Sequence, residues 1–124
     1  MRGEGGAWFK SFGMIDNKLL TGIHTMIVLI HIEKKSTYPY ALLKKFRGSR
    51  HPMLHSIDKN ELYNILNSLE HRGFVKSRMV LAGSKAQKVY AITPKGDESA
   101  RKFKRAFFTF IKSASGIMRD IFAE

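Results

Sequence analysis

Three asparagines and a histidine recur along one side of the segment 58–74, DKNELYNILNSLEHRGF: Asn60, Asn64, Asn67 and His71. Their spacing of four, three and four residues predicts one exposed stripe of an α-helix. The opposite stripe is apolar and consists of Leu62, Ile65, Leu66 and Leu69. An asparagine amide can bind the N6 and N7 atoms of adenine together in the DNA major groove. The stripe therefore indicates either a surface that contacts base edges or an ordinary solvated face.

The composition favours a polyanionic partner. The 124 residues include 22 Lys and Arg against 10 Asp and Glu, a formal net charge of +12. Nucleic acid is the first candidate for such a chain, and an anionic membrane surface is the second. The absence of cysteine excludes disulfides and cysteine-ligated zinc. The longest apolar run, 26–32, is much too short for the ~20 residues of a membrane-spanning helix, so we expect a one-domain cytoplasmic protein without membrane contact.

Two helices are predicted before the stripe. The first starts at residue 16 or 17 and ends at 33–35. Its broad apolar face consists of Leu19, Leu20, Ile23, Met26, Ile27, Ile30 and Ile32. The second is short and covers 38–46, with a loop over 47–57. The helix that contains the stripe then begins at Asp58, where Asp58 and Glu61 fit a reciprocal capping box.

A β-hairpin and a long helix are predicted after the stripe. The two strands cover 75–81 and 86–93, and the flexible basic tip between them covers 82–85. Thr93 and Pro94 then fit the start of a helix over 94–122, in which Gly116 is the expected place for a kink or early end. This order predicts a mainly α fold with a small hairpin, a winged helix-turn-helix. The chain is expected to have three parts: a flexible aromatic extension (1–17), a winged-helix DNA-binding domain (18–93) and a dimerisation helix (94–124).

Basic residues cluster around the predicted hairpin, or wing. Between Glu70 and Asp97 every charged residue is basic, and the same is true between Glu33 and Asp58. Phosphate contacts by such residues supply most of the non-specific affinity for DNA. The alternative is the generally basic surface of a chain with this net charge.

The last helix has an apolar seam with heptad spacing: Ala100, Phe103, Phe107, Phe110, Ala114, Ile117 and Ile121. A domain this small can bury only part of such a face against its own first helix. We expect the start of the helix to pack within the chain and the rest to meet a second copy. Trp8, Phe9 and Phe12 are weaker candidates for covering the partner's last helix.

Enzymatic and metal chemistry have little support. His51 and His55 lie four residues apart, and His24 and His31 lie seven apart, but no carboxylate cluster accompanies either pair. Catalytic triads and phosphate-binding glycine loops are missing from the sequence. We therefore expect no enzyme, no metal and no cofactor.

Three segments resemble the PadR-type transcriptional regulators: YPYALLKKF (38–46), LYNILNSLEHRGFV (62–75) and KVYAITPKG (88–96). The resemblance covers roughly 20–100. It implies a dimeric winged-helix repressor that contacts DNA through the third helix, the wing and a tyrosine of the second helix, here Tyr40. Some members of the family bind a small aromatic effector between their subunits. No residue at a matching position in this chain indicates such a ligand. The chain departs from the family pattern at Pro39, Ala41 and Asn64, where glycine, glutamate and proline are usual.

The sequence predicts a homodimeric transcriptional regulator, a repressor, that binds double-stranded DNA sequence-specifically. Its expected operator is an inverted repeat. The expected DNA contacts are Tyr40, Lys44, Lys59, Asn60, Tyr63, Asn64, Asn67, His71, Arg78, Ser84, Lys85 and Lys88. Tyr63 can equally cover the edge of the core. The expected dimer contacts are Phe103, Phe107, Phe110, Ala114, Ile117 and Ile121. Two alternatives stay open: a winged helix used for protein contacts, and a basic RNA-binding or architectural protein.

Overall fold

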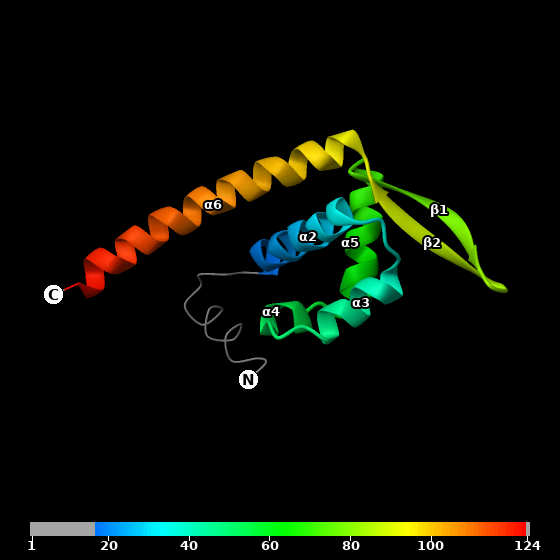
Figure 1. Cartoon of the computed structure of the whole chain (residues 1–124), viewed down its shortest axis with the longest axis horizontal. Helices are drawn as coiled ribbons and strands as arrows, with labels where there is room; N and C mark the ends of the chain where they lie inside the picture. Colours follow the sequence, from blue (N-terminus) through cyan, green and yellow to red (C-terminus); the bar gives the residue numbers. More distant parts are fainter. Residues whose placement is uncertain (1–16, 124) are drawn as a thin grey trace.

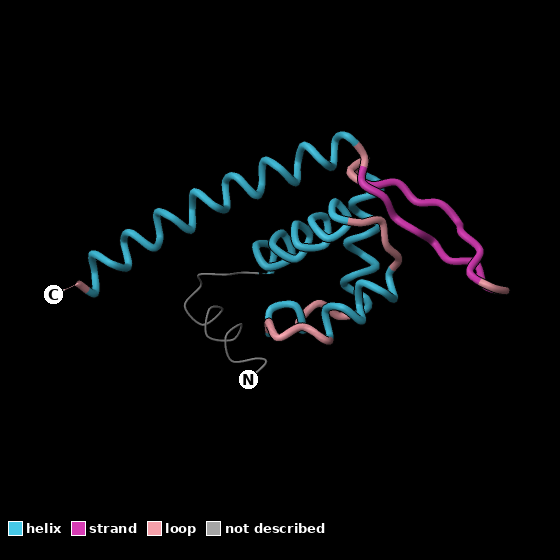
Figure 2. Tube along the Cα trace, viewed as in Figure 1, coloured by secondary structure: helices cyan, strands magenta, loops and turns pink. Residues whose placement is uncertain are grey.

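A computed structural model describes residues 17–123. Its helices and strands are α2 (Asn17–Lys34), α3 (Pro39–Arg47), α4 (Pro52–His55), α5 (Lys59–His71), β1 (Val75–Ala82), β2 (Lys85–Ile92) and α6 (Pro94–Phe122). Figures 1 and 2 show α2, α3 and α5 gathered beside the base of the hairpin, while the hairpin and α6 leave this body in opposite directions. This confirms the predicted mainly α fold with one hairpin. The expected aromatic patch of Trp8, Phe9 and Phe12 lies outside the described residues.

The core lies between α2, α3, α5 and the base of the hairpin. Its fully buried side chains include Val28, Leu29, Ile32, Phe46, Ile57, Leu62, Leu66, Leu69 and Val75. The apolar stripe predicted for α5 is buried, which confirms that amphipathic pattern. The prediction for α2 was wrong in detail. Val28 and Leu29 are fully buried, whereas Ile23, Ile27 and Ile30 are only half-buried and Leu19 is exposed.

The hairpin is a regular antiparallel pair whose strands are paired up to Ala82 and Lys85. The connection is therefore the two-residue turn Gly83–Ser84, rather than the four-residue tip that we predicted. Gly83 has φ +67°, which suits the first position of a type II′ hairpin turn and favours glycine there. At the base, Thr37 and Tyr90 exchange backbone hydrogen bonds of 3.1 and 2.7 Å. These bonds attach the α2–α3 connection to the wing.

The segment 47–57 contains a helix that the sequence did not predict. Pro52 begins the single turn of α4, and the ring of His55 reaches the carbonyl oxygen of Ser49. Proline suits the first helical position because the missing N–H would be unpaired there anyway. A four-residue helix is too short to produce a periodic apolar pattern, so the segment resembled a loop.

The start of α6 is fixed tightly to the end of α5. The Thr93 hydroxyl accepts a hydrogen bond from the Gly96 N–H at 3.1 Å, which confirms the predicted N-cap. A Cβ atom at Gly96 would lie 2.0 Å from the carbonyl oxygen of Phe74, so only glycine allows this approach. Lys95 Nζ donates to the Arg72 carbonyl oxygen at 2.8 Å. From here α6 continues to Phe122, as predicted, and neither alternative considered for Gly116, a kink or an early end, occurs there.

No helix within residues 17–123 combines the length and the apolar character that are required to cross a bilayer.

Candidate nucleic-acid interface

The predicted amide stripe of α5 is exposed along its whole length. Asp58 caps the helix by accepting a hydrogen bond from the Glu61 N–H at 2.8 Å. The buried leucines and Ile65 fix the rotation of the helix about its axis, so the opposite side must face solvent. Asn60, Asn64, Asn67 and His71 are all exposed on that side. The structure therefore presents a row of hydrogen-bonding side chains, three of them amides that can bind base edges.

A buried histidine holds the first turn of α5 in place. His24 of α2 is almost fully buried, with Nδ1 2.6 Å from Glu61 Oε2 and Nε2 3.1 Å from the Ser56 hydroxyl. Glu61 thus contacts α2, and the reciprocal half of the predicted capping box is wrong. No sequence pattern indicates this pairing, because residues 24 and 61 belong to different helices.

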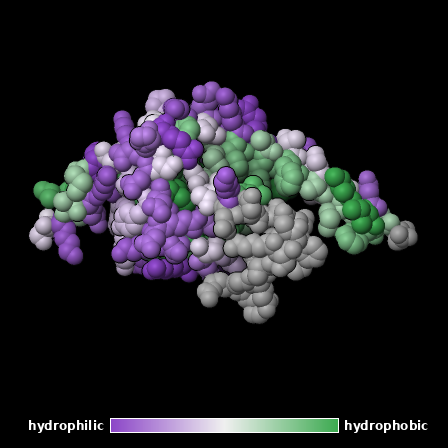
Figure 3. Space-filling model, turned by 180° about the vertical axis from the view of Figure 1, so that it is seen from behind, coloured by the Kyte–Doolittle hydropathy of each residue, from purple (hydrophilic) through white to green (hydrophobic). Residues whose placement is uncertain are grey.

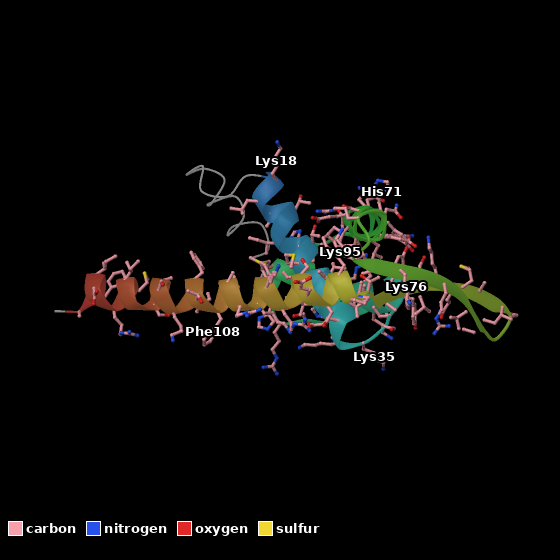
Figure 4. The ribbon with its side chains drawn as sticks, turned by 90° about the horizontal axis from the view of Figure 1, so that it is seen from above. Lys18, Lys35, His71, Lys76, Lys95 and Phe108 are labelled. Atoms are coloured by element: carbon pink, nitrogen blue, oxygen red, sulfur yellow. The ribbon has the colours of Figure 1, made fainter. Side chains whose placement is uncertain are left out.

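One flank of α5 is attached to the wing. The Ser77 hydroxyl donates to Glu70 Oε2 at 2.5 Å, and Lys88 Nζ lies 3.7 Å from Glu70 Oε1. Lys88 also lies over the buried ring of Tyr90, 5.7 Å from its centroid. Figure 4 shows α5 end-on beside the hairpin, with His71 on the helix and Lys76 at the start of β1. The wing therefore has a defined orientation relative to the exposed stripe.

The other flank of α5 borders a shallow polar groove of about 370 Å³. Asn60 and Asn64 line it together with side chains that the sequence did not single out as a group: Thr21, Thr25, Ser68 and Arg72. Arg72 donates to the Ser68 hydroxyl at 2.8 Å and lies over the Phe74 ring. Only the crossing of α2 over α5 brings these residues together, so no sequence pattern could have shown it.

The predicted contacts of the wing and α3 are all exposed, but the wing residues do not share one face. Side chains alternate along a strand, and Arg78 pairs with Val89 whereas Lys88 pairs with Met79. Arg78 and Lys85 therefore lie on one face of the ribbon, Lys88 lies on the other, and Ser84 is in the turn. On α3, Tyr40 is 67% exposed and lies one turn before Lys44. Lys59 and Tyr63 are exposed on α5 beside the amide stripe.

A second surface, apolar, extends along α6. Ala100 is buried and Phe103 is half-buried against the body, and Lys104 Nζ lies 2.9 Å from Glu33 Oε1 of α2. Beyond this point the predicted seam is open, with Phe110 63% exposed and Ile117 and Ile121 similarly exposed. Figure 3 shows hydrophobic residues gathered at this far end. A groove of about 670 Å³ lies nearer the body, between the isoleucines of α2, Met53 and Leu54 of α4, and the phenylalanines of α6.

Comparison with known proteins identifies the family to which this fold belongs. Residues 28–102, more than half of the chain, match the family described as "Transcriptional regulator PadR-like family". The chain belongs to the PadR-like family of transcriptional regulators. No curated protein matches it. Among solved structures, a PadR family transcriptional regulator from Eggerthella lenta is 25% identical, with a TM-score of 0.68, and the match covers 90% of this chain and 96% of that one.

Other solved structures share the fold at lower identity. A PadR-like transcriptional regulator from Bacillus cereus has a TM-score of 0.71 at 20% identity, covering 83% of this chain and 98% of that one. A PadR family regulator from Clostridium difficile has a TM-score of 0.62 at 22% identity, covering 76% and 95%. Its membership of the PadR-like family makes this chain a winged-helix, DNA-binding transcriptional regulator. Within residues 17–123, no three His, Asp or Glu side chains form a group that could hold a metal ion.

Proposed function

We propose that this PadR-like chain is a homodimeric repressor that binds an inverted repeat in double-stranded DNA. The observation that supports this most is the exposed amide stripe of α5 beside a wing without acidic residues. In a winged helix, the third helix of the bundle lies in the major groove, where its side chains meet base edges. Here that helix is α5. Asparagine amides then favour adenine, while avoiding the equal attraction to all sequences that a row of lysines would produce.

Phosphate contacts would set the position of α5 in the groove. Lys59 on α5, Lys44 and Tyr40 on α3, and the wing cations Arg78 and Lys85 are all exposed. Such contacts fix register and orientation on the duplex without selecting a sequence. Lys88 is partly engaged by Glu70, so its contribution should be smaller than that of Lys85.

Dimerisation would follow from the apolar surface of α6. One winged helix contacts only a few base pairs, so useful selectivity needs two copies on half-sites about one helical turn, ~34–36 Å, apart. The open seam from Phe107 to Ile121 is the surface on which we place the second copy. Binding of the dimer would exclude RNA polymerase or an activator from the same DNA, so repression requires no chemistry. We also expect this to take place in the cytoplasm.

Selection of bound duplexes from a random pool by the purified chain tests the proposal. The expected result is an inverted repeat, together with reduced transcription in vitro from a promoter that contains it. A single, non-repeated motif would contradict the dimeric mode of binding. No enrichment at all would favour a winged helix used for protein contacts or a non-specific nucleic-acid-binding protein.

A further inference from the structure

The tip of the wing exposes two large hydrophobic side chains. Met79 is 63% exposed and Leu81 is 77% exposed, and both lie on β1 close to the Gly83–Ser84 turn. Figure 3 shows hydrophobic residues at the end of the hairpin, far from the core. The hairpin extends away from the body at this point, and none of the other elements within residues 17–123 covers either side chain (Figure 1).

Both side chains lie on the same face of the ribbon. Residues two apart along a strand share a face, so Met79 and Leu81 lie on the side of Ser77. Directly opposite them on β2 are Lys88 and Ala86. At the base of the hairpin this face is the one attached to α5, through the hydrogen bond from Ser77 to Glu70. The apolar pair is thus continuous with the face of the wing that adjoins α5.

The charges around this pair indicate what covers it. No acidic residue occurs between Glu70 and Asp97. Lys88 lies on the face of Met79 and Leu81, and Lys76, Arg78 and Lys85 lie on the opposite face of the same ribbon. A surface with this charge attracts a polyanion and disfavours basic partners, including the hairpin of a second copy. DNA offers a matching combination, because its minor groove has apolar sugar walls between two rows of phosphates. Leucine and methionine are among the side chains that enter minor grooves and partly unstack a base step.

We propose that Met79 and Leu81 contact the minor groove beside each half-site and select flexible or A·T-rich steps there. This inference rests on the proposed function, because α5 must occupy the adjoining major groove. It adds a sequence preference to the wing, whose basic residues contribute only phosphate contacts. The preference is indirect, since the energy of deforming DNA depends on the step that is deformed.

The test uses the full chain with Met79→Thr and Leu81→Thr combined, which removes apolar length and introduces a β-branched residue that favours strands at both positions. Val80→Thr is the matched control, because Val80 lies between them on the opposite face. Each protein is taken through selection from the random duplex pool. Binding to the duplex selected by the wild type is then measured over a range of salt concentrations, and sedimentation is measured without DNA.

The double variant should lose the enrichment of flanking A·T or pyrimidine–purine steps and keep the half-site motif. Its affinity for the selected duplex should fall roughly tenfold, within the range for one mismatched base pair. The slope of log affinity against log salt should stay unchanged, because no cation is removed. The Val80→Thr control should match the wild type in all three measurements.

Unchanged flanking preference and affinity in the double variant would overturn the inference while leaving the proposed function intact. A changed sedimentation coefficient with unchanged DNA binding would assign the pair to a contact between copies, and would overturn it as well. If the wild type enriches no sequence, the proposed function and this inference fail together. Leu81→Thr alone provides the same comparison if the double variant does not fold.

Discussion

Asn64 is the residue at which base recognition can be tested most directly. It is exposed at the middle of the α5 stripe and also borders the polar groove beside α2. Asn64→Ala should weaken binding to the selected operator by roughly 1–3 kcal/mol, the value of one bidentate base contact. Binding to random DNA should barely change in a fluorescence anisotropy titration.

Lys59→Ala is the contrasting variant for that titration. We expect its ammonium to contact a phosphate, so its loss should weaken binding to both DNAs and reduce the salt slope by about 0.9. Equal losses on operator and random DNA for Asn64→Ala would show that the amide stripe is only a solvated face.

His31 gives the folded chain a dependence on pH. Burial lowers the pKa of His31 from its ordinary value of 6.5, and the charges of Lys45 and Lys34 act in the same direction. The hydrogen bond between its ring and the Ile27 carbonyl oxygen, 2.8 Å long, opposes this shift in part. Between pH 6.5 and the lowered pKa the unfolded chain binds more protons than the folded chain, so stability falls as the pH falls through this window.

Denaturant unfolding of wild type and His31→Gln between pH 5 and 8 measures this contribution. The wild type should lose more of its free energy of unfolding below pH 6.5 than the variant loses. Identical pH profiles would mean that the ring titrates alike in the folded and unfolded chains.

At the scale of elements, two glycines of α6 should respond oppositely to alanine. At Gly96 the added Cβ would meet the Phe74 carbonyl oxygen, so Gly96→Ala should lower the free energy of unfolding by roughly 1–3 kcal/mol. At Gly116 nothing lies within 4 Å, so Gly116→Ala should stabilise the helix by up to about 1 kcal/mol. Thermal unfolding by circular dichroism measures both, and a stable Gly96→Ala would show that α6 can shift at little cost.

The same elements show how far the sequence alone could lead. The stripes of α5 are cleanly separated into polar and apolar residues, so its buried and exposed sides were predictable. The capping of α6 was predictable too, because Thr93 and Pro94 act within a single turn. In α2 apolar residues occur on nearly every side, so the buried side depends on the packing of α5 and α6. The contact of Glu61 with His24 and the groove beside Asn64 depend on that same packing.

At the scale of the whole molecule, the arrangement of two copies should depend on the seam of α6. The rings of Phe103, Phe107 and Phe110 follow one another at 5.6 and 6.4 Å between centroids. Phe110→Glu would place an unpaired charge in an apolar contact, which is strongly unfavourable. We expect a folded monomer whose affinity for the operator falls far more than its affinity for random DNA.

Sedimentation at micromolar concentration compares wild type, Phe110→Glu and the control Thr109→Glu. The control adds the same charge to the neighbouring residue, which lies off the apolar stripe. A monomeric wild type, or a dimeric Phe110→Glu, would mean that the seam is not the interface.

The close approach of Gly96 to Phe74 also has a mechanical consequence. The 29 residues of α6 make a rod about 43 Å long, of which the first third is held by the end of α5 and by α2, through Gly96, Ala100 and Lys104. By simple geometry, a tilt of about 7° in the ~27 Å of helix beyond Lys104 would move its far end by roughly 3 Å, close to the rise of one base pair. In a dimer joined through α6, the separation of the two DNA-binding surfaces would therefore depend on how firmly the start of α6 is held. The close approach of Gly96 to the Phe74 carbonyl oxygen is part of that attachment.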